Sequence, residues 1–132
     1  MKLTDEILNE IKASSSYIPQ EMRLNTELST FLKEELQSVN LKKMFTSLDI
    51  DVVNGYKYIR GERKLKRDQL IKILVYLEYD FDQVQSTLKQ YGFPMLYSKN
   101  KNDAALIYCI YNRFTYADIK KYLQAHKLIG LQ

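Results

Sequence analysis

The sequence predicts an all-α protein, a bundle of short helices. Glycine and proline are scarce, with four and two residues in a chain of 132, whereas the turns between strands use them often. Apolar residues recur at intervals of three and four along most of the chain, which is the spacing of one helix face. No segment shows the regular alternation that is typical of a strand. The length allows one domain with its own core, or one domain with a small extension.

The N-terminal part of the chain predicts a short helix, a linker and a longer helix. A helix is expected over Asp5–Ala13, where apolar residues share one face. A serine cluster and a proline predict a linker over Ser14–Asn25, so residues 1–25 are assigned to an N-terminal helix and linker. The next helix is predicted over Glu27–Ser38, because its apolar row is interrupted only at Glu35.

The middle of the chain predicts four more helices. They are expected over Lys42–Leu48, Asp51–Arg60, Arg67–Tyr79 and Phe81–Tyr91. Asp51 is the expected N-cap of the second, and Gly61 stands where a C-terminal cap belongs. Asp80 and Gln83 have the spacing of a capping box. A short helix, a tight turn, a second helix and a third apolar helix describe a helix-turn-helix unit, so residues 26–92 are assigned to a helix-turn-helix domain.

Residues 93–132 predict a helical hairpin packed on that domain. Its helices are expected over Asp103–Tyr111 and Tyr116–His126, the second one capped at Thr115. Cys109 is the only cysteine and lies in an apolar run, which indicates a core residue and excludes an internal disulfide. The tyrosines of the hairpin indicate either the face of a homodimer or completion of the core.

Positive charge is concentrated in one segment. The chain has a formal net charge of +4, whereas residues 52–67 hold six basic residues and one acid, a net charge of +5. The basic residues are Lys57, Arg60, Arg63, Lys64, Lys66 and Arg67. They run from the end of one predicted helix across a loop to the start of the next. This arrangement is common in proteins that hold a nucleic-acid phosphate backbone.

Two other charged positions predict structural roles. Arg67 and Asp68 stand at the start of a predicted helix, where the carboxylate suits the helix dipole, and we expect both to be structural. A smaller basic loop contains Lys99, Asn100 and Lys101. It predicts either phosphate contact or a helix cap, and we favour the cap.

Sequence spacing in the central segment matches a known pattern. Asp49 and Gly61 lie 12 positions apart, with the apolar Ile50 and the capping Asp51 after the first and Arg63 shortly after the second. The segment resembles the Cro/C1-type (XRE) helix-turn-helix family, in which a turn residue and the glycine that ends the recognition helix have this separation. The resemblance implies a DNA-binding transcriptional regulator of the repressor type.

Further segments extend the resemblance along the chain. They are LSTFL at 28–32, GERKLKRDQL at 61–70, TLKQYG at 87–92 and LYSKNKNDAALI at 96–107. These segments are similar to a pattern in small regulators of Gram-positive bacteria and their mobile elements, so the resemblance spans about residues 28–125. The sequence departs from the pattern at several positions: Asp49 replaces a glycine, Leu65 replaces a proline, and Phe45 replaces a small or β-branched residue, which predicts altered packing. Gly55 is expected to cost the helix about 1 kcal/mol relative to alanine.

The helix predicted over Asp51–Arg60 is expected to enter a major groove of DNA. Asn54 is the best candidate for reading a base, because an amide can form two hydrogen bonds with adenine. Valine cannot bond a base edge, although it can contact a thymine methyl group. Tyr56 indicates either groove contact or packing. The predicted DNA-binding residues are Val52, Val53, Asn54, Tyr56, Lys57, Arg60, Arg63, Lys64 and Lys66.

Two functions therefore stay open from the sequence. The first is a repressor-like regulator that binds double-stranded DNA, with a homodimer as one option. The second is an interaction module that kept the helix-turn-helix scaffold, lost specific DNA reading and binds a protein partner; the apolar Val52 and Val53 favour it. Nonspecific RNA binding has less support, because no stacking platform is evident.

Other functional classes find no support in the sequence. His126 is the only histidine, and no cluster of cysteine and histidine indicates a metal site. The four glycines are too far apart for a phosphate-binding loop. We therefore expect neither an enzyme nor a cofactor. No apolar run reaches the length of a membrane span, and the N-terminus does not resemble a signal peptide, so a cytoplasmic protein without membrane contact is expected.

Overall fold

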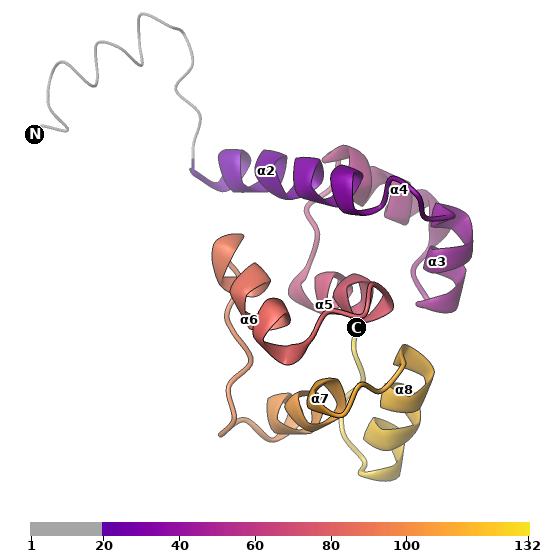
Figure 1. Cartoon of the computed structure of the whole chain (residues 1–132), viewed down its shortest axis with the longest axis vertical. Helices are drawn as coiled ribbons and strands as arrows, with labels where there is room; N and C mark the ends of the chain where they lie inside the picture. The colour runs from indigo at the N-terminus through magenta and orange to yellow at the C-terminus, as the bar shows by residue number, and fades with distance from the viewer. Residues whose placement is uncertain (1–19) are drawn as a thin grey trace, which may run out of the picture.

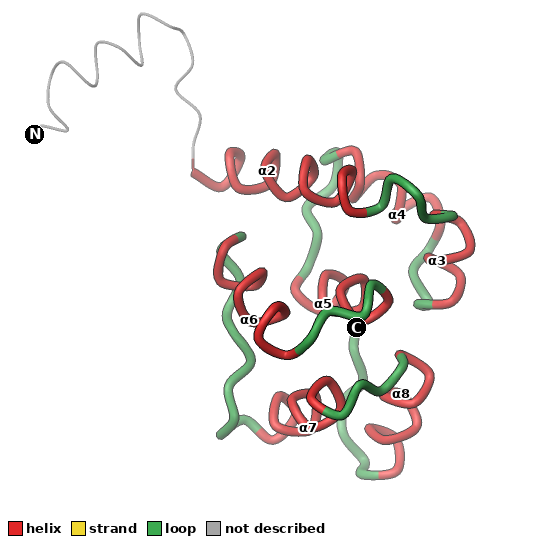
Figure 2. Tube along the Cα trace, viewed as in Figure 1, coloured by secondary structure: helices red, strands yellow, loops and turns green. Residues whose placement is uncertain are grey.

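A computed structural model describes residues 20–132, which fold into helices joined by loops, without a strand (Figures 1 and 2). The helices are α2 (Gln20–Glu35), α3 (Leu41–Ser47), α4 (Val52–Arg60), α5 (Arg67–Tyr76), α6 (Phe81–Gln90), α7 (Lys101–Tyr111) and α8 (Tyr116–Ala125). The predicted all-α fold is confirmed for this part of the chain. The helix predicted over Asp5–Ala13 lies outside the described residues.

Both predicted ends of the first described helix are wrong. α2 begins at Gln20, so the last part of the predicted linker Ser14–Asn25 is helical. Leu24 is half-buried and precedes the buried Leu28 by one turn, so the apolar row extends further toward the N-terminus than the predicted start at Glu27. At the other end α2 stops at Glu35, because the chain leaves the helical conformation to place the N-cap of α3.

Helices α3 and α4 form the predicted helix-turn-helix unit. Asn40 caps α3, since its Oδ1 accepts a hydrogen bond from the Lys43 amide at 3.0 Å. α4 packs against both α2 and α3. In Figure 1 these three helices form one end of the molecule, and α7 and α8 form the other.

α5 is the central helix of the bundle and packs against α6 and α8. Its apolar residues Leu70, Ile71, Ile73 and Leu74 are completely buried. A helix that is apolar on several sides suits a position surrounded by other helices. α5 ends at Tyr76 rather than at the predicted Tyr79, because the following loop turns through a left-handed residue.

Side-chain caps set the starts of the last three helices. The predicted capping box of α6 is confirmed, with Asp80 and Gln83 each bonding the other's backbone amide. α7 begins at Lys101, earlier than predicted, because Asn100 is its cap. Thr115 caps α8 as predicted. α6 and α8 each end one residue before the predicted position, at Gln90 and Ala125.

The C-terminal hairpin of α7 and α8 packs on the rest of the bundle. Cys109 is completely buried on the inner face of α7, which confirms its predicted core role. Tyr108 and Tyr111 lie on the outer face and are 49% and 74% exposed, so the tyrosine-rich helix completes the core on one side only. The chain end is held against α5: the Gln132 amide donates to Asp68 and its carbonyl accepts from Gln69.

Candidate nucleic-acid interface

The turn before α4 is built on a left-handed aspartate. Asp49 has φ 58°, a conformation that glycine adopts freely and aspartate tolerates. Its carboxylate accepts hydrogen bonds from Lys120 Nζ at 2.6 Å and from the Tyr116 hydroxyl at 3.2 Å. The Lys120 ammonium that donates to this carboxylate holds the pKa of Asp49 below its ordinary value. The turn is therefore tied to α8, a link that the sequence pattern did not predict.

A second, buried lysine lies near the same turn. Lys72 is 2% exposed and its ammonium stands 5.3 Å from the centroid of the Tyr116 ring. Burial lowers the pKa of the Lys72 ammonium. Burial likewise raises the pKa of Tyr116 to about 12. The only sequence signal of this site is a lysine inside the apolar run LIKIL.

Both ends of α4 are capped by side chains. Asp51 accepts a hydrogen bond from the Asn54 amide at 3.0 Å, as predicted for the N-cap. At the C-terminal end Gly61 adopts the left-handed conformation, with φ 76°. From α2, Ser29 donates to the Ile59 carbonyl at 2.6 Å and Asn25 donates to the Gly61 carbonyl at 3.2 Å. These donors satisfy carbonyls that a helix end leaves free, and they fix α4 against α2.

The inner face of α4 packs on α3 through a glycine. Gly55 is buried, and a Cβ atom added to it would lie 2.7 Å from the Phe45 ring. The Tyr56 ring stands edge-on to Phe45, with 5.5 Å between the ring centroids. Val52 is half-buried against the same core. Two of the predicted DNA-binding residues, Val52 and Tyr56, are therefore partly buried and pack against the core.

The outer face of α4 carries an apolar residue and two cations. Val53 is 63% exposed, Arg60 is exposed and Lys57 is half-exposed. Their spacing of four and three residues puts them on one helical stripe. Asn54 lies at the edge of this stripe. Its Oδ1 accepts a hydrogen bond from Arg63 Nη1 at 3.0 Å, which joins α4 to the loop that follows it.

Two of the six basic residues in the charged segment have acidic partners. Arg60 pairs with Glu62 on the surface. Arg67 pairs with Asp103 at 2.7 Å and also donates to two carbonyls of the segment before α7, which confirms its predicted structural role. The remaining cations form no ion pair with any residue in the range 20–132; they are Lys57, Arg63, Lys64 and Lys66. We call this set together with Arg60 the basic surface.

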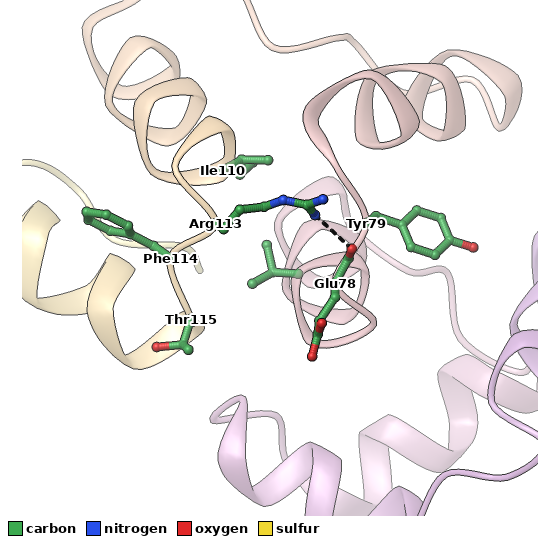
Figure 3. Close-up of a pocket in the computed structure, with 7 residues that line it drawn as sticks. Glu78, Tyr79, Ile110, Arg113, Phe114 and Thr115 are labelled. Atoms are coloured by element: carbon green, nitrogen blue, oxygen red, sulfur yellow. Dashed lines mark hydrogen bonds between the residues drawn. The ribbon is translucent and has the colours of Figure 1, made fainter.

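A hollow of another kind lies away from α4. It has a volume of about 510 Å³ and lies between the loop after α5 and the loop before α8 (Figure 3). The Arg113 guanidinium crosses it and donates to the Glu78 carbonyl at 3.1 Å. Glu78 and Arg113 both have φ 62°. In Figure 3 the Glu78 carboxylate points away from Arg113. The two loops are therefore joined by a hydrogen bond from the Arg113 side chain to the Glu78 backbone, and not by an ion pair.

Comparisons with protein-family models, with curated proteins and with solved structures give no match for this chain. Within residues 20–132, no group of histidine, cysteine and acidic side chains is arranged to hold a metal ion. In the same range no helix has the length and apolar character that crossing a membrane requires.

Proposed function

We propose that the protein is a DNA-binding transcriptional regulator of the repressor type, with a helix-turn-helix unit similar to that of the Cro/C1-type family. The observation that carries the proposal is the outer face of α4. It combines exposed groups suited to a major groove with an adjoining loop of cations that have no acidic partner in the described structure. The hydrogen bond from Arg63 to Asn54 makes these two parts one surface.

In the proposed mechanism, α4 enters the major groove. Lys57, Arg63, Lys64 and Lys66 neutralise phosphates and release counterions, which supplies affinity without sequence information. Arg60 contributes less, because Glu62 competes for its guanidinium. The links from α2 and α8 keep α4 and the preceding turn in place while the basic surface docks.

Two residues of α4 supply base recognition in this proposal. An amide oxygen has two acceptor sites, so Asn54 Oδ1 can bond Arg63 and adenine together while its Nδ2 donates to adenine N7. Val53 is exposed and apolar, which suits contact with a thymine methyl group. The preferred site therefore contains A·T pairs.

The test is binding to labelled duplexes at two salt concentrations, about 50 and 200 mM. One duplex comes from the region upstream of the protein's own coding sequence and the other is unrelated. A preference of about 10³-fold or more for the first is expected from a specific regulator. Equal and strongly salt-dependent binding to both limits the function to backbone binding. Absence of binding to either duplex contradicts the proposal.

One observation favours a second candidate function. Val53 is among the most exposed large apolar side chains of the described residues and lies on the helix that reads DNA in the first proposal. An interaction module that retains the scaffold and binds a protein partner through α4 uses the same exposed valine. Retained partner binding in a Lys64→Ala/Lys66→Ala variant that loses DNA binding supports this second function.

A further inference from the structure

Two lysines flank Asn100, one in the turn before α7 and one at the first position of α7, and neither side chain helps to hold the described structure together. Asn100 Oδ1 accepts a hydrogen bond from the Asp103 amide at 2.9 Å and is the cap of α7. Lys99 and Lys101 are exposed and form no ion pair with a residue in the range 20–132. The capping role expected for this loop therefore belongs to Asn100, and both ammonium groups face solvent.

The same turn is tied to the start of α5, directly after the basic loop. Arg67 Nη2 contacts Asp103 Oδ1 at 2.7 Å, and Arg67 Nη1 donates to the carbonyls of Pro94 and Met95 at 3.1 and 3.3 Å. The Tyr97 amide donates to Asp103 Oδ2 at 2.9 Å. These bonds hold Pro94, Met95 and Asp103 against Arg67, the residue that follows Lys66.

A small hollow confirms that the two segments are neighbours. It has a volume of about 320 Å³, and its walls include Lys64 and Leu65 from the basic loop and Phe93 and Pro94 from the segment before α7. Phe93 and Pro94 therefore lie next to the basic loop, and Met95 is joined to Arg67 by a hydrogen bond.

The acids in this region are already engaged. The Asp103 side chain is 9% exposed and paired with Arg67. Asp68 accepts a hydrogen bond from the Gln132 amide. Neither carboxylate forms an ion pair with Lys99 or Lys101.

We propose that Lys99 and Lys101 form a second phosphate-binding patch, on the part of the chain that Arg67 ties to the basic loop, through which the C-terminal hairpin lengthens the contact with DNA. This inference rests on the proposed DNA-binding function. Each neutralised phosphate adds about 0.9 to the steepness of the plot of log affinity against log salt. The hairpin is then a part of the DNA-binding surface as well as a cover for α5.

The experiment measures that slope for the full chain and for two double variants on the same duplex. Lys99→Gln/Lys101→Gln removes the proposed patch and keeps Asn100. Lys121→Gln/Lys127→Gln is the matched control, because it removes the same charge from exposed positions on the α8 side of the hairpin. Helix content and urea unfolding of both variants establish that they fold. A Lys99→Arg/Lys101→Arg variant tests whether charge alone is needed.

The proposal predicts that Lys99→Gln/Lys101→Gln reduces the slope by about 1.8, lowers affinity on the order of 10-fold at 0.15 M salt, and leaves base preference unchanged. The control and the arginine variant are expected to keep the slope of the original chain. DNA binding with equal slopes for the proposed patch and the control overturns this inference alone. A chain that binds no duplex overturns both the inference and the proposed function.

Discussion

The Phe45 ring occupies the space that a side chain at Gly55 would need, since an added Cβ would lie 2.7 Å from three ring atoms. Phe45 lies on α3 and Gly55 on α4, the two helices of the helix-turn-helix unit. The ring of the first fills the space that the second leaves empty. A phenylalanine in α3 requires a glycine in α4 if the helices are to stay in contact. Gly55 has a low helix propensity, but its lack of a side chain allows α4 to pack closely on α3.

Gly55→Ala is expected to destabilise the protein although alanine is the better helix former. Helix propensity alone favours the variant by about 1 kcal/mol, whereas overpacking against the Phe45 ring costs about 1–3 kcal/mol. Urea unfolding measures the difference. Gly130→Ala is the control, because nothing lies within 4 Å of its added Cβ. A double variant Phe45→Leu/Gly55→Ala is expected to recover stability; if it is no more stable than Gly55→Ala, the packing account is wrong.

The bond between Asp49 and Lys120 predicts a pH-dependent contribution to stability. The folded state lowers the pKa of Asp49, so the contribution is complete above the unfolded value of about 3.9 and is lost as pH falls through the lower folded value. Both side chains are about half exposed, so the expected size is below about 1 kcal/mol. Unfolding of the original chain and of Lys120→Met from pH 2 to 7 checks this. A stability difference that grows as pH falls contradicts it.

The Cys109 thiol is expected to be unreactive in the folded protein. It is completely buried, and burial raises its pKa to about 11, so little thiolate forms at pH 8. A thiol reagent such as 5,5′-dithiobis(2-nitrobenzoate) is expected to label it at the rate of unfolding and to label it at once in strong denaturant. Fast labelling of the native protein at pH 8 is the contrary result.

Arg63 and Lys64 are expected to affect DNA binding differently, although each carries one charge. Both alanine variants reduce the salt slope by about 0.9. Only Arg63→Ala also frees the Asn54 amide, so only it is expected to lower the preference for the specific duplex, on the order of 10-fold. Affinities for specific and unrelated duplexes, measured for both variants, decide the point. If both variants lose the preference for the specific duplex equally, Arg63 does not position the Asn54 amide.

Val53 is expected to make affinity depend on thymine methyl groups. Replacing thymine by uracil at the contacted position removes only a methyl group, and its burial is worth about 0.8 kcal/mol, or about fourfold in affinity. The effect is expected to disappear in Val53→Ala and to persist in Val52→Ala, because Val52 packs inward. Uracil scanning of the preferred duplex measures it. Insensitivity to every thymine methyl group shows that Val53 has another role.

Local features of this fold could be predicted from the sequence, whereas long-range pairs could not. Caps such as Asp51, Asp80 and Thr115 act within a few residues, so their spacing was enough to place helix starts. The bond between Asp49 and Lys120 joins residues 71 positions apart. No periodicity carries such information, because the partner is chosen by how the helices pack.

The same distinction applies to the candidate site. Charge concentration singled out the basic segment, yet the sequence could not show which of its cations pair with acids. Arg67 was expected to be structural from its position, and its partner Asp103 became evident only in three dimensions. The separation of Val52 from Val53 likewise depends on which face of α4 meets the core.

The most direct test of the central claim is amide chemical-shift mapping of the isotope-labelled chain titrated with its preferred duplex. We expect the perturbed amides to lie in α4 and the basic loop, with a second group at the turn before α7. Asn54→Ala is expected to bind the preferred and the unrelated duplex more nearly equally. Shifts confined to the outer face of α7 and α8, or no shifts at all, would contradict DNA binding by α4.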